Sequence, residues 1–288
     1  MVCSQRGEHC SSCQQSARCA YSYVFETPAP PDSEVLRTHE AVPRPFVFEP
    51  PLDSRLQYVP GDNLVFNLVL VGRGIEYLPC FILAFKELGA EGLGRQRGRF
   101  RLQQVWAQDP LGPWETLIYD GPTDSFRNAE MSAGIDDVQR VASGLPEQDL
   151  VVRFLTPACL KSQGKIAQQP PFHVLIRALL RRMSSLSYFH CGERWDTDYK
   201  GLIEQAQEVE TTQADVSWQD WERYSSRQNQ RIGAGGVVGW LRFVGPLADY
   251  RFLLVLGAIV HVGKGCVFGN GLYRIEEPFA NGHVQDAV

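Results

Sequence analysis

The chain has 288 residues, and its 28 Lys and Arg against 33 Asp and Glu give a net charge of −5, which excludes a general polycation. With 44% hydrophobic and 21% charged residues, the composition excludes disordered, collagen and coiled-coil proteins and predicts one large or two modest domains. The longest apolar run, residues 252–260, is far shorter than the roughly 20 residues of a membrane span. The first residues lack the apolar run of a signal peptide, so we expect a cytoplasmic protein.

Four of the eight cysteines cluster near the N-terminus, at Cys3, Cys10, Cys13 and Cys19. Reduced thiolates at this spacing can surround one zinc ion, and the central Cys-x2-Cys is typical of a zinc knuckle. The outer spacings match no standard finger, so an iron–sulfur cluster and unligated cysteines stay open as alternatives. Because four thiolates would close the coordination shell, we expect a structural metal in a cysteine-rich segment over residues 1–26.

Residues 27–146 indicate a first α+β domain. The proline-rich stretch at its start predicts an extended crossing with one edge strand over 45–48, and an apolar run over 64–71 predicts a strand. Pro79 opens a helical pattern that ends in a glycine cluster at 89–98. Residues 99–104 alternate as a strand with one buried face, whereas 108–146 lack strong periodicity and contain the domain boundary.

Residues 147–288 indicate a second domain. The pattern predicts a strand over 150–155, helices over 172–186 and 199–209, strands over 216–224 and 237–244, a helix over 250–260 and a strand over 272–275. Without the extra helix at 199–209, this is the βαββαβ order of a ferredoxin-like fold.

A glycine-rich loop follows the last predicted helix. Gly263, Gly265, Gly269 and Gly271 fall within nine residues, and Lys264 lies between the first two. The helix–loop–strand order is the reverse of a dinucleotide-binding turn, and the first glycine and final hydroxyl residue of a Walker loop are missing. Because glycine has no side chain, the backbone amides of this loop can approach a phosphate closely, and Lys264 adds a positive charge beside them. The loop is therefore predicted to contact a nucleic-acid phosphate, while a simple tight turn stays open as the alternative.

The charges of the chain are segregated. Between Arg223 and Arg274 there are seven basic residues and one acidic residue, a net charge of +6, which leaves −11 for the rest. This predicts a localised phosphate track within an acidic protein, with a second basic patch around Arg95 and Arg97. A solvated strand face is the alternative reading.

Four motifs occur in order: Gly92-Leu-Gly-Arg-Gln-Arg-Gly-Arg-Phe, Leu155-Thr-Pro followed by a helical Arg-Arg, Arg223-Tyr-Ser-Ser-Arg-Gln, and the run from His261 to Ile275. Together they resemble the CRISPR repeat-processing endoribonucleases of the RAMP superfamily, and the cysteine cluster before Tyr-x-x-x-Phe-Glu-Thr-Pro resembles that of one branch. The resemblance implies two tandem ferredoxin-like domains that bind precursor CRISPR RNA and cut it once within each repeat. Members usually carry a strand and a helix, often with a catalytic histidine, ahead of the cysteines, so the first domain is expected to be incomplete.

The implied reaction is a metal-independent attack of the ribose 2′-OH on the adjacent phosphate, which leaves a 2′,3′-cyclic phosphate and a 5′-OH. It needs a base, a cation and an acid at the phosphate. The candidate catalytic residues are His261, at the start of the glycine loop, and His190, beside Cys191. Phosphate binding or helix capping stays open for His261.

The expected RNA contacts are the loop residues and a further set of mostly basic side chains. This set comprises Arg223, Tyr224, Ser226, Arg227, Gln228, Arg242, Arg274, Arg95 and Arg97. For Tyr224 and Ser226, ordinary strand exposure is the alternative. For the whole chain, the alternative function is a catalytically inactive guide-RNA-binding subunit of a CRISPR effector complex.

Overall fold

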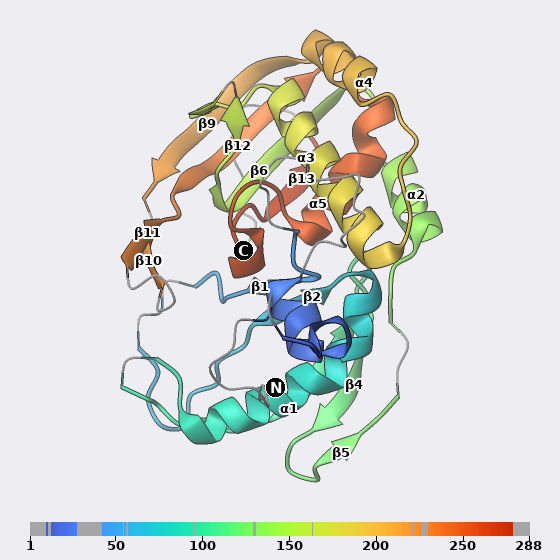
Figure 1. Ribbon diagram of the computed structural model, residues 1–288. Helices are drawn as coiled ribbons and strands as arrows, with labels where there is room; N and C mark the ends of the chain where they lie inside the picture. Colours follow the sequence, from blue (N-terminus) through green and yellow to red (C-terminus); the bar gives the residue numbers. More distant parts are fainter. Residues whose placement is uncertain are drawn as a thin grey trace. The chain divides into compact units, whose positions relative to one another are not determined.

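A computed structural model describes residue 10 and residues 13–27, 42–53, 55, 57–94, 96–128, 131–162, 164–220, 222–225 and 230–278, without the side chains of residues 17, 222–225 and 230–232 (Figure 1). The chain divides into two compact units. The first contains Met1–Phe46, Leu70–Val138 and Phe189–Gly192, and the second contains Val47–Val69, Gln139–Tyr188 and Glu193–Val288. Among the described residues, no helix has the length and apolar character that a bilayer crossing requires.

The first unit combines one long helix with a small antiparallel sheet. Helix α1 (Leu78–Glu91) has Pro79 in its first turn, as expected, and buries Phe81 and Ile82. The sheet has the order β3-β4-β5, with β3 at Gln104–Gln108, β4 at Glu115–Asp120 and β5 at Ser125–Phe126. Its three strands are antiparallel.

One prediction for this region was wrong. The strand expected over 99–104 begins only at Gln104, because residues 99–103, although Phe100 and Leu102 are half-buried between exposed neighbours, pair with no other strand in the described part of the chain. The stretch over 108–146, which shows no strong periodicity in the sequence, contains β4, β5 and α2 (Ile135–Ser143). These elements are short, so their buried residues, such as Val138 and Ala142 of α2, give only one helical repeat in the sequence.

The second unit is built on a four-stranded antiparallel sheet. Its strands are β6 (Asp149–Ala158), β9 (Glu210–Gln219), β12 (Gly236–Val244) and β13 (Tyr273–Glu276), in the order β13-β6-β12-β9. Helix α3 (Phe172–Leu186) lies between β6 and β9 in the chain, and α5 (Arg251–Val260) between β12 and β13. This is the βαββαβ order expected for this half, with the extra helix α4 (Tyr199–Gln205) after α3 (Figure 1).

The core of this unit lies between the sheet and two packed helices. Leu150, Val152 and Phe154 alternate along β6 and are at most 2% exposed, as are Leu179 of α3 and Leu254 of α5. Because sheet residues alternate between faces, the side chains between them, such as Arg153, belong to the opposite face.

Short elements complete the fold. The two-stranded pairs are β1 (Phe46–Glu49) with β2 (Asn67–Leu70), β7 (Lys161–Ser162) with β8 (Lys165–Ile166), and β10 (Glu222–Ser225) with β11 (Gln230–Gly233). The single strand expected over 216–224 is therefore two strands, since the chain leaves the main sheet after β9 to form the β10–β11 hairpin. Single helical turns lie at Ser16–Arg18, Ser22–Glu26, Gly72–Tyr77, Ser187–Cys191, Ala206–Glu208, Ala248–Tyr250 and Cys266–Phe268.

Candidate nucleic-acid interface at the glycine loop

The glycine loop connects the end of α5 to β13. His261 follows α5 with φ 64° and ψ 170°, an extended positive-φ conformation that non-glycine residues rarely adopt and that costs about 1–3 kcal/mol. The four glycines that follow also have positive φ values, between 75° and 95°. The loop therefore needs glycine for its backbone path, as the tight-turn reading proposed.

The predicted loop contacts divide into an inner and an outer group. Gly269 and Gly271 are buried: a Cβ atom on Gly269 would lie 2.5 Å from Pro50, and one on Gly271 would lie 1.8 Å from the Val262 carbonyl oxygen. Glycine at these two positions therefore allows neighbouring segments of the chain to pack closely against the loop backbone. Gly263 and Gly265 are half-buried and Lys264 is exposed, so these three form the outer edge of the loop.

The outer edge offers donors to an anion. In the described loop, the amides of Val262, Lys264, Phe268, Gly269 and Gly271 donate to backbone carbonyl oxygens, whereas those of Gly265 and Val267, like those of Gly263, Cys266 and Asn270, have no backbone acceptor. Gly265 is left-handed and precedes the helical turn Cys266–Phe268, an arrangement that turns successive amides toward one side. Lys264 adds a charge next to these amides. Val267 was not singled out from the sequence, because only the glycines carried a signal.

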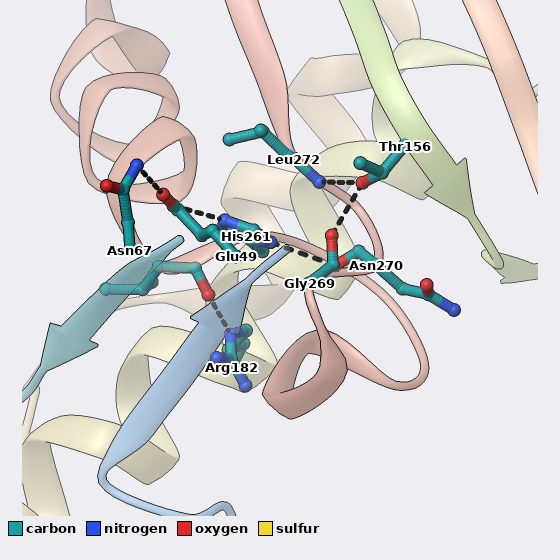
Figure 2. Close-up of polar contacts among 9 residues, drawn as sticks. Glu49, Asn67, Thr156, Arg182, His261, Gly269, Asn270 and Leu272 are labelled. Carbon is teal, nitrogen blue, oxygen red and sulfur yellow. Dashed lines mark hydrogen bonds and ion pairs between the residues drawn. The ribbon is translucent and has the colours of Figure 1, made fainter. Parts of the chain in front are cut away.

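The back of the loop is fixed by a polar network (Figure 2). His261 Nε2 lies 2.9 Å from Glu49 Oε1, and His261 Nδ1 lies 3.2 Å from the Asn270 carbonyl oxygen. Asn67 Nδ2 donates to the other oxygen of Glu49 at 3.0 Å. Burial alone would raise the pKa of Glu49, but the hydrogen bonds from His261 and Asn67 outweigh it and hold the pKa below its usual value.

Two further side chains tie the ends of the loop to the unit (Figure 2). Thr156 Oγ1 donates to the Gly269 carbonyl oxygen at 2.7 Å and accepts from the Leu272 amide at 2.9 Å. Arg182 Nε donates to the Val260 carbonyl oxygen at 2.8 Å, which gives this carbonyl at the C-terminal end of α5 a hydrogen-bond donor. Sequence reasoning gave none of these residues a role, although Thr156 and Arg182 lie within the Leu155-Thr-Pro and Arg-Arg motifs.

Both predicted catalytic histidines are fully buried, and each belongs to a different unit. His190 Nδ1 lies 3.0 Å from the Tyr23 hydroxyl, and its Nε2 lies 2.6 Å from the Pro43 carbonyl oxygen. Burial raises the pKa of Tyr23 to about 12, so the hydroxyl that contacts His190 keeps its proton. Neither His190 nor His261 could meet a phosphate here without displacing these partners, and their catalytic assignment stays a prediction.

The other expected RNA contacts are placed as follows. Arg242 donates from Nε and Nη2 to both carboxylate oxygens of Asp149, at 2.9 and 2.6 Å, so its guanidinium is occupied within the sheet unit. Arg274 is exposed on β13 and faces Arg153 in the strand register. Arg97 is exposed in the turn that Leu93 and Gly98 close.

The remaining candidates have no described side chain. Arg223 and Tyr224 lie on β10 with their side chains outside the description, and Arg95, Ser226, Arg227 and Gln228 lie outside the described residues. Their expected RNA contacts stay predictions.

The zinc prediction gains no support. Cys3 lies outside the described residues. Within them, Cys10, Cys13 and Cys19 included, no group of three or more His, Cys, Asp or Glu side chains is placed to hold a metal ion. The four-thiolate site stays a prediction.

Comparison with known proteins gives two family matches. Residues 152–273 match the family of the CRISPR-associated endoribonuclease Cas6, and residues 1–131 match a family described as an N-terminal domain. No curated protein sequence matches the chain significantly.

Solved structures share the fold at low sequence identity. A partial Cas6-RT-Cas1–Cas2 complex aligns at a TM-score of 0.50 and 15% identity, over 83% of this chain and 40% of that one. A Cas6 (TTHB231) product complex aligns at 0.49 and 17% identity over 82% of both chains, and Thermus thermophilus Cas6 (TTHB231) at 0.45 and 14% identity over 80% and 78%. The mixed α+β architecture with antiparallel sheets is therefore one that Cas6 structures also have.

Proposed function

We propose that the chain is a CRISPR-associated endoribonuclease of the Cas6 type, which cuts precursor CRISPR RNA within each repeat and keeps the product crRNA bound; the match of residues 152–273 to the Cas6 family supports this proposal. We place this activity in the cytoplasm, where such RNA is transcribed. Subunits of a CRISPR effector complex are the further partners that this proposal implies. Its architecture would be two tandem ferredoxin-like domains, the first incomplete, with the boundary near residue 146 between the two family matches.

The observation that carries this proposal is the outer edge of the glycine loop. The amides of Gly265 and Val267 and the ammonium of Lys264 form a compact set of donors for a phosphate, on a backbone that the Glu49–His261 network holds from behind. Such a set binds the RNA backbone without reading its sequence. It also suits the charge that develops on a phosphate under attack by a 2′-OH.

The chemistry proposed is metal-independent transesterification with cyclic phosphate and 5′-OH ends. We test it by incubating the purified protein with end-labelled repeat RNA in EDTA, and with the same RNA carrying a 2′-deoxy nucleotide at the cut position. Cleavage of the first RNA alone is expected, because only the first supplies the nucleophile. Cleavage of the deoxy RNA would contradict the mechanism.

The alternative, an inactive guide-RNA-binding subunit, is favoured by one observation. Of the histidines that the structure describes, His190 and His261 are buried with both ring nitrogens engaged, and only His173 on α3 reaches solvent. RNA that is bound but stays intact in EDTA and in Mg²⁺ would establish this alternative.

The loop contact has its own test. Lys264→Ala should weaken RNA binding and reduce the slope of log K against log salt by about 0.7 to 0.9, the value for one released counterion. Lys200→Ala is the matched control, because Lys200 is an exposed lysine of the same unit on α4. Equal slopes for the two variants would show that Lys264 does not contact the RNA.

A further inference from the structure

Lysine is rare in this chain, and its five lysines differ in their surroundings. They are Lys86, Lys161, Lys165, Lys200 and Lys264. Lys86 pairs with a carboxylate, that of Asp124, and Lys200 lies 3.6 Å from that of Glu204. The other three are exposed, and within the described part of the chain none of them forms an ion pair or a side-chain hydrogen bond.

These three lysines lie at one place in the second unit. Lys161 is on the β7–β8 hairpin, and the Lys264 amide donates to the Cys159 carbonyl oxygen, two residues before it, at 3.1 Å. Leu160, the residue between them, packs against the loop: its Cδ2 atom lies 3.2 Å from the place where a Cβ on Gly263 would be. The base of the hairpin therefore lies directly beside the outer edge of the glycine loop.

The hairpin presents positive charge on both of its faces. Its register pairs Lys161 with Ile166 and Ser162 with Lys165. Because directly opposite residues share a face of the ribbon, the two lysines belong to opposite faces. At the turn, no described atom outside its chain neighbours lies within 4 Å of the place where a Cβ on Gly164 would be. The end of the hairpin is therefore not packed against other described residues.

The segment that contains the hairpin has no negative charge of its own. Residues 150–192 include six Lys and Arg but neither Asp nor Glu, a net charge of +6 in a chain whose net charge is −5. Cations without carboxylate partners, next to backbone amides without backbone acceptors, suit a polyanion with regularly spaced charges.

We propose that the β7–β8 hairpin is a second phosphate-binding element, in which Lys161 and Lys165 hold the RNA backbone next to the phosphate at the glycine loop. The inference rests on the proposed function of that loop. A lysine ammonium binds phosphate as a point charge, so these contacts add affinity without reading the sequence. The hairpin thus lengthens the stretch of RNA that the second unit holds.

The test removes the two charges while the side-chain length is kept. Lys161→Gln and Lys165→Gln should each weaken binding of repeat RNA and reduce the slope of log K against log salt by about 0.7 to 0.9, and the double variant by about twice that. A double variant with arginine at both positions keeps the charges and should keep the slope. Lys200→Gln is the matched control, because it removes an exposed lysine of the same unit away from the hairpin.

The outcomes separate this inference from the proposed function of the loop. If Lys264→Ala lowers the salt slope and the double glutamine variant does not, the hairpin is no RNA contact and the loop contact stands. If neither lowers it, both the hairpin and the loop fail as RNA contacts.

A measurement on the unaltered protein does not depend on how any variant folds. Because the chain has only five lysines, mass spectrometry after acetylation can follow each of them with and without repeat RNA. The RNA should protect Lys161, Lys165 and Lys264 and leave the labelling of Lys86 and Lys200 unchanged. Unchanged labelling of both hairpin lysines, with Lys264 protected, would overturn the inference, and unchanged labelling of all three would overturn the loop contact as well.

Discussion

The two glycine-rich turns of this chain are held in different ways. The turn from Gly92 to Gly98 is closed by its own ends, since Leu93 and Gly98 exchange two backbone hydrogen bonds of 2.8 and 2.9 Å. The loop from Gly263 to Gly271 is held by side chains that lie far away in the sequence, Glu49 and Thr156 among them. A turn that closes itself needs only local sequence. A loop that presents hydrogen-bond donors to a ligand also needs side chains that hold it in place, so that little conformational entropy is lost on binding.

Among the variants that test this difference, Gly271→Ala is expected to have the largest effect. Gly271 has a φ of 75°, and a Cβ atom there would lie 1.8 Å from the Val262 carbonyl oxygen, a backbone atom that cannot move alone. We expect a loss of about 3 kcal/mol or more in the free energy of unfolding, measured by urea denaturation, together with loss of RNA binding. A loss as small as that of an open turn glycine would mean that the loop is not rigidly backed.

The next test removes one support. Thr156→Val deletes a hydroxyl that bonds both Gly269 and Leu272, and should cost about 2 kcal/mol because a carbonyl and an amide lose their partner. Thr156→Ser keeps the hydroxyl and is the control. Urea unfolding of the two variants checks this, and equal stability would show that the hydroxyl does not hold the loop.

Local sequence predicted much of the second unit. Helices α3 and α5 and strands β6 and β12 were expected because each has a long apolar period of its own. The loop was identified as a candidate site because glycine and lysine carry a local signal. Its supports were not, since Glu49 lies 212 residues before His261 and its strand β1 was predicted only as a proline-flanked edge strand. The pairing of Arg242 with Asp149, 93 residues away, is the same kind of long-range contact.

A smaller effect is expected in the self-closed turn. Gly94 has a φ of 76°, almost that of Gly271, but no atom lies within 4 Å of the place where its Cβ would be. Gly94→Ala should therefore cost only the strain of the left-handed backbone, about 1 kcal/mol, and leave the affinity for RNA unchanged. Because the two glycines have nearly the same φ, the difference between their alanine variants mainly measures the close packing around Gly271. A cost equal to that of Gly271→Ala would remove the distinction between the two turns.

The smallest effect concerns acid, and it separates the two turns by their chemistry, because a carboxylate, that of Glu49, contacts the second one from behind. The pKa of Glu49 lies below its ordinary value of 4.5 in the folded protein, so folding favours the ionised form. The stability that this ionisation contributes is present above about pH 4.5 and is lost as the pH falls through the lowered pKa. Unfolding curves between about pH 5 and pH 3 should therefore fall less steeply with acid in Glu49→Gln than in the unaltered protein, while Glu147→Gln, the same change at a glutamate that pairs with Arg251, should follow the latter. Identical slopes in all three proteins would show that Glu49 gains nothing from its contacts with His261 and Asn67, and the loop would then be held by hydrogen bonds from neutral groups.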